Sequence, residues 1–224
     1  MKKIDTHVHT SEVSKCGRMS AQEIVTAYKR AGYGAIVITD HLKLSEIAGT
    51  GMKPYEIVEH QLKGYLAARE SAGSDIEVFL GAEIRFTSGD EDYLLIGLDE
   101  QKYFELARQL PDDPKSCREL MKSLDCLIYQ AHPFRPGLTP ASPDALDGIE
   151  VYNGNPRHDS HNDAARLFAE RHHLKMLSGS DSHRPEDIAH GGILTPDWVR
   201  SSSALVRFLR ETPPPHMIID GTEF

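Results

Sequence analysis

The amino-acid sequence predicts an α/β fold in which a parallel sheet closes into a barrel, with an open doubly wound sheet as the alternative. Two observations lead to this prediction. Short apolar runs alternate with segments of helical periodicity along the 224 residues, which is the pattern of repeated βα units. Residues able to bind metal follow several of these runs, as expected where the carboxyl ends of parallel strands share one face.

About seven strands are expected from the apolar runs. Residues 35–38 are apolar throughout, as in a strand covered on both faces, and residues 3–8 are a partly β-branched first strand. Further buried strands are expected at residues 76–80, 93–96, 126–129, 149–152 and 175–177.

Helices are expected between most of these strands. Ser20 and Glu23 have the spacing of a capping box, and the helix that they begin should end at Gly32 or Gly34. A second helix should run from Pro54 to Gly73, and apolar residues within 164–168 mark a third. Residues 195–196, Thr-Pro, are expected to begin a fourth that carries Leu205, Val206 and Leu209.

Composition and charge limit the possible classes. The length and a hydrophobic fraction of 39% suit one domain over residues 1–224. No run approaches the ~20 apolar residues of a membrane span, and no signal peptide is visible, so no membrane partner is expected. Three scattered cysteines suit a reducing cytoplasm. A net charge of -9 disfavours long nucleic acids as partners, and the oligomeric state stays open.

Histidine is the unusual residue, since the chain has twelve. The strand period of two would send His7 and His9 to the same side of the first strand, where they could bind one cation. Other potential ligands follow the later strands: His41, Glu83, His132, Asp181 and His183.

Imidazoles combined with carboxylates suit manganese, zinc or iron better than calcium or magnesium. Seven such residues exceed the four ligands of one tetrahedral zinc, so two or three divalent metal ions are expected. Glu83 is suited to bridge two of them because a carboxylate has two oxygens. Two ions ~3.5–4 Å apart would hold a hydroxide and an oxyanion, the arrangement for displacement at phosphorus.

Each motif also has an ordinary structural interpretation. His7 and His9 could be polar residues of a barrel mouth, and Asp40-His41 could form a turn. Glu83 could pair with Arg85, and Asp181 could cap a helix. Five motifs at five strand ends favour the metal site. Outside these motifs, surface positions are expected for His60, His172, His173 and His216.

The motifs, taken together, resemble those of the polymerase and histidinol phosphatase (PHP) superfamily. The matching segments are Asp5-x-His7-x-His9-Thr10, Thr39-Asp40-His41, Gly81-x-Glu83, Ala131-His132-Pro133 and Gly179-Ser180-Asp181-Ser182-His183. The resemblance implies a distorted (β/α)7 TIM-like barrel, up to three metals and phosphoesterase activity. Substrates across the family include histidinol phosphate, nucleotides, phosphotyrosine and DNA 3′ ends.

The resemblance also implies how the ligands are shared. One metal would be held by His7, His9, Glu83 and Asp181. Glu83 would bridge to a second metal that His132 binds, and a third would be held by His41 and His183. Two family ligands have no counterpart in this chain. Glu12 or Cys16 could complete the third site, and Asp92 or Asp99 is the nearest replacement at the second.

The expected reaction is attack of a metal-bridging hydroxide on the phosphorus of small phosphate esters, namely phosphomonoesters, nucleotides or cyclic phosphodiesters. Glu83 and Asp181 would act through the metals, and His183, His158 or a metal-bound water would protonate the leaving oxygen.

Several further residues are expected around the reacting groups. Arg135 and Arg157 have the planar guanidinium that suits phosphate, and Asn153 and His158 are further candidates for substrate contact. The two acids beside ligand histidines, Asp5 and Asp40, are expected to orient the imidazoles.

Two alternatives stay open. The chain could be a degenerate barrel that binds metal without catalysis and serves a partner. It could also resemble the amidohydrolases and cleave C–N or C–O bonds, although no lysine follows a strand at the place where such sites have a bridging one.

Overall fold

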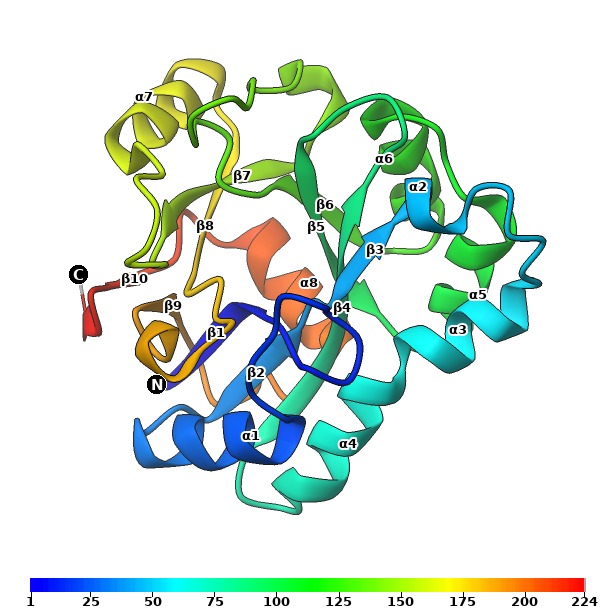
Figure 1. The fold of residues 1–224 in the computed structure, drawn as a ribbon. Helices are drawn as coiled ribbons and strands as arrows, with labels where there is room; N and C mark the ends of the chain where they lie inside the picture. The colour runs from blue at the N-terminus through cyan, green and yellow to red at the C-terminus, as the bar shows by residue number, and fades with distance from the viewer. Residues whose placement is uncertain (224) are drawn as a thin grey trace.

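An 11-stranded curled sheet forms the centre of the molecule (Figure 1). The computed structural model describes residues 1–223. The hydrogen-bonded order is β11-β10-β9-β1-β2-β4-β5-β6-β7-β8, and the short β3 pairs with β4. The strands are β1 Lys2–Val8, β2 Ala35–Ile38, β3 His41–Lys43, β4 Glu77–Arg85, β5 Asp92–Leu98, β6 Leu127–Gln130, β7 Gly148–Asn153, β8 Lys175–Gly179, β9 Gly191–Thr195, β10 Met217–Ile219 and β11 Thr222–Glu223.

The sheet is mixed and open, so the predicted parallel barrel is correct only in part. β5 is antiparallel to both β4 and β6, and β9 is antiparallel to β1. Only residues 86–91 separate β4 from β5, whereas a parallel crossover needs about a dozen residues or more. β8, the last strand in this order, approaches β1, and an isolated β-bridge joins Val8 to Ser182 there. The result is an α/β fold whose sheet curls toward a barrel.

Most helices cover the outside of the curled sheet, whereas α8 lies within the curl and packs against several strands (Figure 1). Their bounds are α1 Ala21–Arg30, α2 Leu44–Ile47, α3 Pro54–Gln61, α4 Lys63–Ala72, α5 Glu100–Gln109, α6 Pro114–Ser123, α7 Asn162–His172 and α8 Ser202–Glu211, with 3-10 turns at Pro143–Ala145 and Pro185–Asp187. Within residues 1–223, none has the length and apolar character that a bilayer crossing requires.

Most of the helix predictions made from the sequence are confirmed. Ser20 and Glu23 form the predicted capping box of α1. The helix expected from Pro54 to Gly73 is divided at Leu62 into α3 and α4. The helix expected from Thr195 is wrong at its start, because Thr195 ends β9 and α8 begins after Ser201, whose side chain caps it. The predicted apolar face of α8 is buried as expected: Leu205, Val206 and Leu209.

The direction of each strand decides which residues lie at the mouth of the curled sheet, the edge at which β1, β2 and β4 end. β2 runs parallel to β1 and to β4, and β7 runs parallel to β6 and to β8. The reversed β5 begins at the mouth, since Asp92 pairs in register with Arg85 at the end of β4. One edge of the sheet therefore carries the ends of the parallel strands together with the start of β5.

Candidate metal centre

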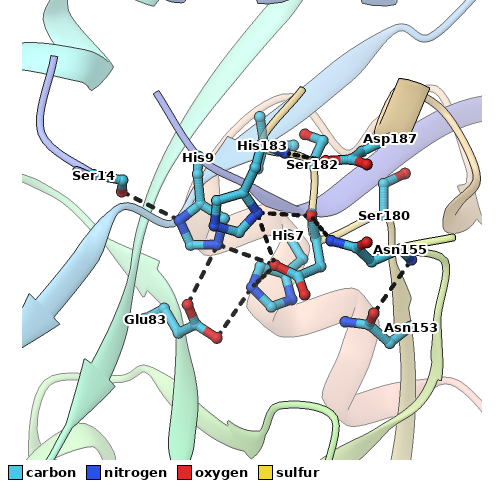
Figure 2. Close-up of polar contacts among 12 residues, drawn as sticks. His7, His9, Ser14, Glu83, Asn153, Asn155, Ser180, Ser182, His183 and Asp187 are labelled. Atoms are coloured by element: carbon cyan, nitrogen blue, oxygen red, sulfur yellow. Dashed lines mark hydrogen bonds and ion pairs between the residues drawn. The ribbon is translucent and has the colours of Figure 1, made fainter. Parts of the chain in front are cut away.

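The predicted ligands meet at this edge. Figure 2 shows His7 and His9 from the end of β1, Glu83 from β4 and His183 from the loop after β8 pointing toward one another. The cluster comprises five histidines and three acids: His7, His9, His41, His132, His183, Glu83, Asp92 and Asp181. In three groups of these residues, all potential ligand atoms lie within 4.8 Å of one another.

β1 places His7 and His9 on the same side, as its alternation predicts. Both imidazoles are fully buried. The Nε2 atom of His7 lies 3.2 Å from Glu83 Oε1 and 3.5 Å from Asp181 Oδ1. The Nε2 atom of His9 lies 3.3 Å from Glu83 Oε2 and 3.5 Å from Asp181 Oδ1. These four side chains, which the family resemblance assigns to one metal, therefore share one small volume.

His132 contacts the same Glu83 oxygen as His7, and Asp92 lies next to His132. His132 Nε2 is 3.2 Å from Glu83 Oε1 and 4.0 Å from Asp92 Oδ2. Arg85 donates to both oxygens of Asp92, at 2.8 and 2.6 Å, so the alternative pairing of Arg85 with Glu83 is wrong. Asp99 instead caps α5 by accepting a hydrogen bond from Lys102 N, so only Asp92 reaches the cluster.

Cys16 lies beside His41 and His183 on the wall of the cleft. Partial burial would raise the pKa of its thiol, but the two neighbouring imidazoles outweigh burial and lower the pKa to about 6. Glu12, the other candidate ligand for the third metal, is held elsewhere, which corrects that prediction. Its two oxygens accept hydrogen bonds from Ala21 N at 2.9 and 3.1 Å, which holds its carboxylate at the start of α1.

The cluster fits bound cations. The buried atoms without a hydrogen-bond partner include Nε2 of His7 and of His9, Nδ1 of His41 and Oε2 of Glu83. An unpaired buried polar atom is costly, so convergent ones indicate a missing partner. Burial would raise the pKa of Glu83, but His7 and His41 outweigh it and hold that pKa well below its usual value. Glu83 is therefore an anion enclosed by nitrogen donors.

Two of the clustered residues have unusual backbone conformations. His132 has φ 28° and Asp181 has φ 51°, in the left-handed region that non-glycine residues rarely adopt. Such conformations concentrate at functional sites, where the surrounding structure holds them. Gly179 is also required, because a Cβ atom there would lie 2.5 Å from the Cβ of His7.

Asp5 and Asp40 do not contact an imidazole, which corrects their predicted role. Asp5 accepts hydrogen bonds from the backbone N of His7 at 3.1 Å and of Ser180 at 3.0 Å, so it joins the ends of β1 and β8. Asp40 accepts from Ser14 Oγ at 2.6 Å, and that hydroxyl lies 3.3 Å from His9 Nδ1. Asp40 therefore reaches the His9 ring only through Ser14.

Sequence reasoning missed Glu150, which contacts an imidazole directly. Its Oε1 lies 2.9 Å from His7 Nδ1, and its Oε2 accepts hydrogen bonds from His132 N and Asn153 Nδ2, both at 2.9 Å. Glu150 is fully buried in β7. The signal was a lone carboxylate within the apolar run of residues 149–152, since a buried charge normally requires a partner.

Cationic side chains surround the mouth of the cluster. A cleft of about 240 Å³ is lined by most of the clustered residues, though not by His7 or His9, together with Arg135, Arg157 and His158. Arg135 Nη2 donates to Asp181 Oδ2 at 2.8 Å and to Asn153 Oδ1 at 3.1 Å. Arg157 donates to both oxygens of Asp187. Asn153 is buried behind Arg135, so it supports that arginine and does not line the cleft.

Comparisons with known proteins agree with this geometry. A family model described as the PHP domain matches residues 5–204. No match was found among curated proteins. A two-domain protein from Bacteroides vulgatus, described as containing a predicted PHP-like metal-dependent phosphoesterase, has a similar fold, with a TM-score of 0.68 at 18% identity. The match covers 99% of this chain but 66% of that one.

Two further solved structures share the fold. PsfC from Pseudomonas syringae has a TM-score of 0.67 at 17% identity, with coverage of 97% of this chain and 91% of that chain. A lesion-specific endonuclease from Pyrococcus furiosus has a TM-score of 0.63 at 17% identity, covering 96% of this chain and 57% of that one. At these identities the similarity shows the fold alone.

Proposed function

Because the chain belongs to the PHP domain family, we propose that it is a metal-dependent hydrolase of small phosphate esters. The observation that carries the proposal is the convergence of unpaired imidazole nitrogens on Glu83 and Asp181, beneath a cleft lined by arginines. Acids and imidazoles suit cations, and arginines suit the oxygens of a phosphate. The site therefore offers groups for both the metal ions and the phosphate of a metal-assisted phosphoryl transfer.

The proposed ligand sets follow the family resemblance and the contacts among these side chains. His7, His9, Glu83 and Asp181 would hold one ion, and Glu83, His132 and Asp92 would hold the next. The third position would have Cys16, His41 and His183. When bound, divalent cations supply Lewis acidity and lower the pKa of water. Thiolate and imidazole ligands favour zinc or iron at the third position, whereas the oxygen-rich second position also suits manganese.

The chain's own residues would position the substrate and move the protons. Arg135 and Arg157 are placed to bind the non-bridging phosphoryl oxygens at the cleft. In the proposed hydrolysis a water oxygen bonds to phosphorus, and the bond from phosphorus to the ester oxygen breaks. The departing alkoxide would take a proton from His158, which lines the cleft, and the attacking water would release one in turn. A phosphomonoester would give inorganic phosphate and a free alcohol, and a cyclic phosphodiester would give a phosphomonoester.

The test is reconstitution with manganese, zinc or iron, followed by a panel of histidinol phosphate, nucleotide monophosphates, cyclic phosphates and aryl phosphates. We expect phosphate release that depends on added metal, with elemental analysis giving two or three ions per chain. Bound metal without turnover of any ester would instead support the non-catalytic module. Cleavage of amides alone, in a parallel panel, would support the amidohydrolase-like alternative.

A further inference from the structure

A second cavity lies directly beside the metal centre and has a different chemical character. Its volume is about 480 Å³, and Cys16, His41 and Lys43 belong both to its wall and to the wall of the metal cleft. The two spaces are therefore neighbours that share one partition. A molecule whose phosphate lay in the cleft could extend its remaining atoms into this cavity.

The far wall of this cavity is apolar. Val13 comes from the loop after β1, Ile47 from α2, Ile57 from α3, and Met52 from the segment between these two helices. Figure 1 shows α2 and α3 at the right of the molecule, with the loop after β1 nearer its centre. Met52 is a large apolar side chain with 38% of its surface exposed, whereas Ile57 is 2% exposed and belongs to the core. The cavity thus offers an apolar surface fixed to the core.

Glu46, the one acid among the described residues that line the cavity, is paired with Lys15. Lys15 Nζ donates to Glu46 Oε2 at 2.6 Å, and both side chains are largely exposed. The acid at the rim is therefore neutralised by its own neighbour. This contrasts with the metal cleft, whose lining is mostly histidine, arginine and acid. Ligand sites commonly combine a few polar anchors with an apolar wall of this kind.

We propose that this cavity binds the organic part of the substrate, and that the preferred substrates are phosphate esters of alcohols bearing an aromatic ring. The inference rests on the proposed phosphoesterase function, which places the phosphate in the cleft. Aliphatic cavities of about 150 Å³ bind benzene, so this cavity has room for a ring and a short linker. Lys43, on the shared wall, lies where the phosphate and the ring would meet.

The test compares 2-phenylethyl phosphate with ethyl phosphate, because the two leaving alcohols have similar acidity and differ in the ring. Burial of the ring should raise kcat/KM by about 10- to 100-fold. The Met52→Glu substitution, which puts a charge at the apolar wall, should remove most of that preference. Leu167→Glu is the matched control, since Leu167 is 64% exposed on α7 and lies outside the cavity. It should keep both the preference and the basal rate.

Two further outcomes separate this inference from the proposed function. Equal kcat/KM for the two esters in the wild-type protein, or full preference in Met52→Glu, would overturn the cavity assignment and leave phosphoesterase activity standing. Turnover of neither ester would count against the activity itself. Calorimetry with 2-phenylethylphosphonate and ethylphosphonate on metal-loaded wild-type protein then decides the cavity, and equal affinity would refute it.

Discussion

The floor and the rim of the metal centre are built differently. On the floor, His7, His9, Glu83 and Asp181 are at most 2% exposed and extend from strands or from the turn after β8. At the rim, Cys16 is exposed, and the side chains of His41 and His183 are 14% and 11% exposed. The sheet fixes the floor, whereas two of the three rim residues, Cys16 and His183, come from loops. We infer that the floor sets the chemistry and that the rim adjusts it.

The largest expected effect is at the floor. Glu83→Ala removes the carboxylate shared by two proposed ion positions. Metal catalysis contributes several kcal/mol, so kcat/KM should fall by about 1000-fold or more. Bound metal per chain should also fall while the circular dichroism spectrum stays folded. Glu170→Ala, on the exposed side of α7, is the control. Wild-type activity and metal content in Glu83→Ala would break the assignment.

A smaller effect is expected one contact away from the floor. Glu150→Gln would replace an acceptor oxygen by an amide donor near His7 Nδ1, His132 N or Asn153 Nδ2, so one of these contacts must be lost. Such supporting residues typically change metal affinity by about 10- to 100-fold. Competition with a chelator measures this affinity, and Glu170→Gln is the matched surface control. Unchanged affinity would show that Glu150 does not position His7.

The smallest expected effect is at the rim. Cobalt bound at Cys16 should show a sulfur-to-cobalt charge-transfer band, which Cys16→Ser should abolish while activity falls by about tenfold or less. The control is Cys126→Ser, since Cys126 is buried at the start of β6 and lies outside the cleft. A band that persists in Cys16→Ser would remove this cysteine from the ligand set.

Alkylation gives an independent check of the same rim. Cys16 is exposed, whereas Cys117 and Cys126 are buried, so iodoacetamide should modify Cys16 first in the metal-free protein. Added zinc should slow this reaction, as peptide mass spectrometry would measure. Equal labelling with and without zinc would argue against a metal at Cys16.

The floor was more predictable from the sequence than the rim. The alternation of His7 and His9 fixes their common side, and each later motif stands where a strand ends. The sequence could not distinguish Glu12 from Cys16 as a metal ligand, because a loop has no periodicity that fixes the direction of a side chain. Only the fold shows that Glu12 binds Ala21 N while Cys16 turns toward His41.

Strand direction was the main error in the fold, although a signal was present. The short, polar segment at residues 87–90, Thr-Ser-Gly-Asp, is typical of a hairpin loop, and it turns β4 back into β5. No strand was predicted at Gly191–Thr195, and Thr195 was expected to begin a helix, but this segment pairs with β1 and β10. That pairing is between segments distant in sequence, which local patterns do not encode.

The hairpin between β4 and β5 also has a practical consequence. Residues 87–90 are exposed, yet the hairpin is anchored by Arg85 and Asp92 at the edge of the centre. Exposed loop tips tolerate insertions because their backbone is not held by the core. A short peptide carrying a fluorophore could therefore be inserted between Ser88 and Gly89, where it would sense ions and esters arriving at the mouth without replacing any proposed ligand.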